Sequence, residues 1–132
     1  MRRMKPGSTL ASLLIGAWTA LGACSGPFFP VPPPAEVTFS SQTLTDGTGA
    51  PRTLWRATRG PDPLAASAHF FLQDVTQRTG VDSFAETDGS YTSPLFEGQP
   101  GDRIDLYFQR SNGDESQNAC LLLQEGSAPR CP

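Results

Sequence analysis

The sequence predicts a small all-β domain, a sandwich of two sheets with about seven strands, which follows a signal peptide and a proline-rich tether. The chain has 132 residues, a length that suits one domain. From residue 36 onward, short apolar runs alternate with Gly, Pro, Asp and Asn, which is the pattern of short strands joined by turns. No segment of that region keeps helical periodicity for three turns. Two facing sheets are the natural way to bury many half-apolar strands.

Residues 1–23 have the layout of an export signal. A basic start with Arg2, Arg3 and Lys5 precedes an apolar run from Leu10 to Ala23. As a helix this run would be about 21 Å long, which is short of the roughly 30 Å core of a bilayer. We therefore expect a signal peptide rather than a permanent membrane-spanning helix.

The signal ends in Leu21-Gly22-Ala23-Cys24, which resembles the lipobox of bacterial lipoproteins. The resemblance implies that the signal peptidase recognises Leu21, Gly22 and Ala23, and that Cys24 becomes the lipidated first residue of the mature chain. Several acyl chains on one cysteine hold a protein on a membrane durably, because each buried methylene contributes about 0.8 kcal/mol. In this family an Asp after the cysteine favours the inner membrane, so Ser25 favours the outer membrane. An incidental cysteine after a short helix is the alternative.

Residues 24–35 are predicted to be the lipidated cysteine and a tether. The prolines between residues 26 and 34 lack backbone donors and fix φ, which favours polyproline II over helix or sheet. At about 3.1 Å per residue, such a tether would hold the domain up to roughly 34 Å from the lipid. Contact of Phe28 and Phe29 with lipid headgroups, or docking of the prolines on a partner, are the alternatives.

Residues 36–132 are predicted to form the β-sandwich, and the clearest strand is Arg103–Gln109. In this strand Ile104, Leu106 and Phe108 fall on one face, which makes them predicted core residues. Further strands are expected around Val37 and Phe39, Leu54-Trp55, His69–Leu72 and Leu121–Leu123. Turns are expected at Asp46-Gly47 and Asp88-Gly89, where the backbone can adopt positive φ, and near Pro61 and Pro63, which lack ladder donors.

Part of this region resembles bacterial immunoglobulin-like domains. The resemblance rests on Phe71–Thr76, Thr87–Thr92, Gln99–Leu106 and the turn Ser111–Ser116. The segment Thr45–Pro51 is similar to the first hairpin of carboxypeptidase-regulatory-like or transthyretin-like sandwiches, although the spacing to the next turn differs. Either resemblance implies a noncatalytic β-sandwich, and neither identifies a ligand.

Cys120 and Cys131 remain after Cys24, an even number in a chain that an export signal sends to an oxidising compartment. We expect them to form a disulfide that stabilises the fold by roughly 3 kcal/mol. Free thiols and an interchain disulfide are the alternatives. Two cysteines and one histidine without a CxxC spacing do not make a tetrahedral metal site.

His69 is the only histidine and therefore the candidate general base. No nucleophile elbow, zinc-protease motif or phosphate-binding loop accompanies it, so we expect a strand histidine that faces solvent or makes one structural hydrogen bond. Asp102 and Asp105 could suggest a glycosidase pair, but at the start of a strand we expect them to face water. The sequence thus predicts a nonenzymatic protein with no catalytic residues and no cofactor.

Acidic residues of several turns could offer oxygen ligands to calcium. These residues are Asp46, Asp88, Asp102, Asp114 and Glu115. Their spacing is unlike that of an EF-hand, so no metal site is predicted.

The remaining recognition candidates are Trp55 and three arginines. In strand spacing Arg52 and Arg56 share a face and Trp55 points the other way, so we expect Trp55 in the core and the arginines, Arg59 included, on a solvated face. After residue 5 the chain carries seven basic against thirteen acidic residues, which argues against nucleic-acid binding.

These observations predict a lipid-anchored protein of the cell envelope, placed at the outer membrane, whose β-sandwich is a noncatalytic binding or structural module. The expected partners are the membrane, through the lipid on Cys24, and an envelope protein or glycan. The alternative function is an accessory or assembly factor of an envelope secretion or polysaccharide-export complex, and a hydrolase accessory is a third.

Overall fold

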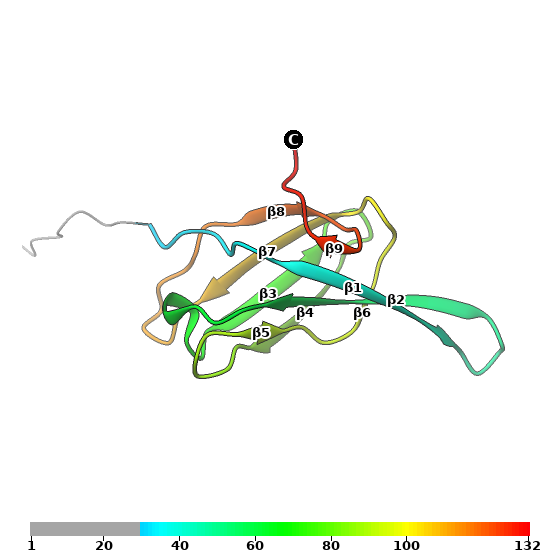
Figure 1. Ribbon diagram of the computed structural model, residues 1–132, viewed down its shortest axis with the longest axis horizontal. Coiled ribbons are helices and arrows are strands. Elements are labelled where there is room, and N and C mark those ends of the chain that lie inside the picture. The colour runs from blue at the N-terminus through cyan, green and yellow to red at the C-terminus, as the bar shows by residue number, and fades with distance from the viewer. Residues whose placement is uncertain (1–29) are drawn as a thin grey trace, which may run out of the picture.

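The computed structural model describes residues 30–132, which form a sandwich of two antiparallel sheets (Figure 1). The predictions for residues 1–29, including the signal peptide, Leu21, Gly22, Ala23 and the lipidation site Cys24, lie outside the described residues. Within the described part of the chain, no helix has the length and hydropathy needed to cross a membrane.

One sheet has the strand order β5-β2-β1-β9, and β6 also pairs with β2. Its strands are β1 (Thr38–Thr45), β2 (Pro51–Arg59), β5 (Tyr91–Thr92), β6 (Phe96–Glu97) and β9 (Gly126–Ser127). The second sheet has the order β4-β3-β7-β8. It consists of β3 (His69–Asp74), β4 (Thr79–Phe84), β7 (Arg103–Gln109) and β8 (Ala119–Leu122). A short 3-10 helix, η1 (Pro63–Ala65), lies between β2 of one sheet and β3 of the other.

The predicted all-β sandwich is confirmed, but the described residues form nine strands rather than about seven. The strands β5, β6 and β9 have two residues each, which is too short for an alternating pattern to appear in the sequence. The expected strand at 103–109 is β7 with the same bounds. The last long strand begins two residues earlier than expected, at Ala119.

The core lies between the sheets and is rich in aromatic rings. Ile104, Leu106 and Phe108 are fully buried, as predicted. The Phe70 ring of one sheet stacks on the Tyr91 ring of the other, with centroids 4.1 Å apart and planes 12° apart. Trp55 is also buried, as predicted, and its indole N–H donates to the Gly98 carbonyl at 2.9 Å.

The two predicted Asp-Gly turns are present, with one correction. In the β1–β2 hairpin, Asp46 Oδ1 accepts the Thr48 and Ala50 amides at 2.8 and 3.0 Å, but positive φ occurs at Gly49 rather than at Gly47. In the second turn Gly89 has a φ of 84°, and a Cβ there would overlap the Asp62 carbonyl. Only glycine fits that position.

Cys120 and Cys131 lie in disulfide geometry with their Cα atoms 5.3 Å apart, which is consistent with the predicted pairing. The Cys131 amide also donates to the Cys120 carbonyl at 2.9 Å. The pair therefore holds the C-terminal tail against β8.

Replacing both Cys120 and Cys131 by serine should lower the free energy of unfolding by roughly 3 kcal/mol, because the unfolded chain regains the entropy of a closed loop. Urea unfolding of the oxidised protein and the double variant measures the difference. Labelling of both thiols in the folded, unreduced protein would contradict the disulfide.

Candidate functional site

Four ring side chains form a continuous row on the outward face of the β4-β3-β7-β8 sheet. His69 and Phe71 come from β3, Phe84 from β4 and Tyr107 from β7. Residues two apart on a strand share a face, and the register sets His69 opposite Phe84 and Phe71 opposite Tyr107. We call these four residues the aromatic row.

The rings of the aromatic row stack on one another. Successive centroids are 4.4 Å (Phe84 to His69), 4.2 Å (His69 to Phe71) and 5.0 Å (Phe71 to Tyr107) apart. The ring planes differ by 18°, 38° and 17°, in the same order. Because each inner ring packs against a ring on either side, contact is left to the ring edges and to the two end rings, of which Phe84 is exposed and Tyr107 is half-buried.

His69 lies in the middle of the row and is held by one polar contact. Its Nε2 lies 2.6 Å from Asp82 Oδ2 on β4. This agrees with the expectation of a strand histidine with one structural hydrogen bond. His69 thus contacts Asp82 and packs between the Phe71 and Phe84 rings.

The Phe84 end of the row is the most exposed. The Phe84 side chain has 68% of its surface exposed, the largest fraction among the large hydrophobic residues of the described chain. Phe84 is also the last residue of β4, an edge strand. Within residues 30–132, β4 pairs with β3 on one side and with no strand on the other. An exposed aromatic residue on a free sheet edge is typical of an interaction site. Phe84 was missed in the sequence because it stands alone in a polar segment.

A shallow groove runs along the same face at the other end of β3 and β4. The larger part has a volume of about 500 Å³ and is lined by Gln73, Asp74, Val75, Arg78, Thr79 and Gly80. A smaller hollow of about 150 Å³ shares Gln73 and Gly80 and extends to Phe71 and Asp82. The groove therefore continues the surface of the aromatic row.

The expectation that Asp102 faces water is wrong. Asp102 is 5% exposed, and it lies beside Asp74, which is 1% exposed. Asp105 is half-buried on the outward face, where its Oδ1 lies 3.4 Å from Arg103 Nε. Burial, reinforced by contact with the Asp102 carboxylate, raises the pKa of Asp74 to about 6. Asp74 was not singled out in the sequence, where it reads as an ordinary residue before a turn.

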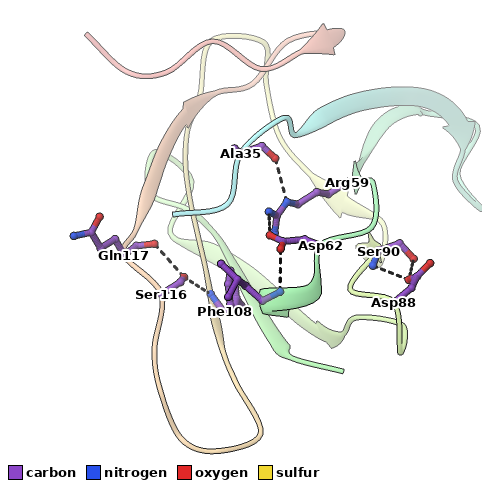
Figure 2. Close-up of polar contacts among 9 residues, drawn as sticks. Ala35, Arg59, Asp62, Asp88, Ser90, Phe108, Ser116 and Gln117 are labelled. Carbon is purple, nitrogen blue, oxygen red and sulfur yellow. Dashed lines mark hydrogen bonds and ion pairs between the residues drawn. The ribbon is translucent and has the colours of Figure 1, made fainter. Parts of the chain in front are cut away.

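Three of the acidic turn residues accept hydrogen bonds from residues of the same turn. Hydrogen bonds from the Thr48 hydroxyl and amide lower the pKa of Asp46, and those from the Ser90 hydroxyl and amide lower that of Asp88 (Figure 2 shows the second pair). Asp114 accepts a bond from the Asn112 side chain at 3.1 Å. Across residues 30–132, no three His, Cys, Asp or Glu side chains gather in a metal-binding cluster.

Two of the three arginines lie where they were expected, and the third does not. Arg56 is exposed, and Arg52 forms an exposed ion pair with Glu97. Arg59 was expected on the solvated face, but its side chain is only 10% exposed and pairs with Asp62. The difference arises because the segment before β1 lies against Arg59, which donates to the Ala35 carbonyl.

Residues 31–35, expected within the tether, lie against the sandwich. Arg59 Nε donates to the Ala35 carbonyl at 3.1 Å, and Asp62 Oδ1 accepts the Leu64 amide at 3.0 Å (Figure 2). Pro34 is fully buried. The Arg59–Asp62 pair thus joins the segment to the end of β2 and to η1.

A second contact fixes the start of this segment. Val31 bridges to Ser116, and the Gln117 amide donates to the Val31 carbonyl at 2.9 Å. Ser116 Oγ in turn accepts the Phe108 amide at 2.9 Å and donates to the Gln117 carbonyl at 3.0 Å (Figure 2). The segment is therefore held at the end of β7, next to Gln109, which pairs with His69.

Comparison with known proteins gave no match to any family model, curated protein or solved structure.

Arg59→Met should lower the free energy of unfolding by about 2 kcal/mol, because it leaves the half-buried Asp62 carboxylate unpaired and removes the bond to Ala35. Arg56→Met, on the exposed side of the same strand, is the matched control and should change it by less than about 0.5 kcal/mol. Chemical unfolding measures both. Equal effects of the two substitutions would show that the Arg59 contacts do not hold the segment.

Proposed function

We propose that this chain is a lipid-anchored protein of the cell envelope whose β-sandwich is a noncatalytic binding module. The observation that carries the binding role is the aromatic row, which ends in the exposed ring of Phe84. Exposed aromatic side chains beside polar groups are frequent anchors of protein and glycan recognition. The proposed partner is an envelope protein or glycan.

The anchoring role rests on the sequence, through the lipobox-like segment that ends in Cys24. The contacts of residues 31–35 add a distance limit. Only six backbone steps separate Cys24 from residue 30, so the described domain would begin within about 21 Å of the lipidated residue. That distance is shorter than the roughly 34 Å expected if the tether ran up to residue 35. In this proposal the end of the sandwich that contacts Val31 lies close to the membrane surface.

This attachment has a consequence for the aromatic row. The segment is held next to Gln109, and Gln109 pairs with His69. The Phe84 and His69 rings thus lie at the same end of the sandwich as Val31, near the start of the described chain. A partner of the row would be a molecule that lies near the membrane surface, such as an envelope protein or a surface glycan.

A photo-crosslinking residue at position 84 of the full-length protein in intact cells should give a reproducible crosslinked product, because Phe84 is proposed to touch the partner. The matched control is position 44. Leu44 is also exposed but lies in β1, on the other sheet, and should give no such product.

The absence of a product at position 84, or the same products at both positions, would contradict the binding role of the row. Identification of the product as a component of a secretion or polysaccharide-export complex would favour the alternative role as an accessory or assembly factor.

A further inference from the structure

Two buried carboxylates, Asp74 and Asp102, lie close enough to interact at the end of the sandwich opposite residues 31–35. Asp74 ends β3 and Asp102 precedes β7. Asp74 Oδ1 accepts the Gln77 amide at 2.9 Å, and Asp102 Oδ2 accepts the Gln99 amide at 2.9 Å. Each carboxylate therefore holds one turn, the β3–β4 turn in the first case and the loop before β7 in the second.

The second oxygen of Asp74 is enclosed and has no hydrogen-bond partner among residues 30–132. A Cβ placed on Gly98 would lie 3.2 Å from Asp74 Oδ2, 2.6 Å from a Leu123 methyl carbon and 3.6 Å from the Trp55 ring. An ionised carboxylate in such a site is costly, and a second carboxylate beside it adds repulsion. A proton on either carboxyl group supplies the missing donor and removes one charge.

The charged group that faces Asp74 is Asp102. Around Gly98, which lies close to Asp74 Oδ2, the other near side chains are the neutral Trp55 of β2 and Leu123, which follows β8. The Arg103 guanidinium turns outward to Asp105, and Arg78 is exposed in the turn and joins no ion pair of the described chain. Without a compensating cation, burial and Asp102 together raise the pKa of Asp74 to about 6.

We propose that Asp74 and Asp102 form a proton-operated latch: a shared proton holds the β3–β4 turn and the loop 98–102 together, and loss of this proton loosens both. The inference is independent of the proposed binding function. The β3–β4 turn forms one wall of the larger groove, with Val75 and Arg78. The latch therefore makes the shape of this groove depend on pH.

The direction of the pH dependence follows from the raised pKa of Asp74. The folded state holds the proton more tightly than the unfolded chain, whose carboxyl group keeps the ordinary value of 3.8. The stabilisation is complete below that value and is lost as the pH rises through about 6. The latch is thus closed in acid and loosened at neutral pH.

Hydrogen exchange of the Gln77 and Gln99 amides in the full-length protein in detergent micelles tests the latch. After correction for the intrinsic pH dependence, protection of both amides should fall about tenfold between pH 5 and pH 7.5. Asp74→Asn should keep the protection constant, since its amide oxygen accepts from Gln77 and its amide nitrogen donates to Asp102. Asp88→Asn, in an exposed turn, is the control and should follow the wild type.

Unchanged protection in the wild type, or a tenfold fall that persists in Asp74→Asn, would overturn the latch. If that variant does not fold, NMR of the wild-type protein decides: the chemical shift of the Asp74 side-chain carboxyl carbon is followed as a function of pH. A pKa of Asp74 below about 4.5 overturns the proposal. Recovery of protection at pH 7.5 on addition of Ca²⁺ would also overturn it, because the pair would then be a cation site.

Discussion

The register between β3 and its two neighbours is the constraint on which both faces of the second sheet depend. It sends Phe70 and Leu72 inward to meet Leu106 and Phe108, and the same pairing sends His69 and Phe71 outward. A shift of β3 by one residue would exchange the two faces and expose the core. The inter-sheet stack of Phe70 on Tyr91 holds this register against such a shift. The aromatic row is therefore fixed by the interactions that build the core.

The sequence predicts those features of the fold that depend on local alternation. Strand β7 alternates over seven residues, so its bounds and its core residues are both predicted correctly. By contrast, β5, β6 and β9 are short and exist only because a longer strand pairs with them. The aromatic row also depends on long-range pairing, since Phe84 meets His69 only through the β3–β4 register. Its rings are visible in the sequence, but their proximity is not.

Two polar pairs, the half-buried Arg59–Asp62 and the buried Asp74–Asp102, differ in a way that residue spacing does not reveal. Arg59 and Asp62 have opposite charges, so each offsets the burial of the other, and together they fix the segment before β1. Asp74 and Asp102 carry like charges when ionised, so burial and the neighbouring carboxylate raise the pKa of Asp74. In the sequence Arg59 and Asp102 are typical surface residues, and only the packing of distant segments over them buries their side chains. The wrong predictions that Arg59 and Asp102 are exposed to solvent thus have the same physical cause.

We propose that a lipid on Cys24 holds this sandwich at a membrane, with its aromatic row near the surface. Intact-mass measurement of the protein extracted from membranes tests it most directly. A lipid anchor at this position requires a chain that begins at Cys24 and carries the added mass of a diacylglyceryl group, with or without a further acyl chain. A chain that begins at Met1, or one that begins at Cys24 without acyl mass, would contradict it.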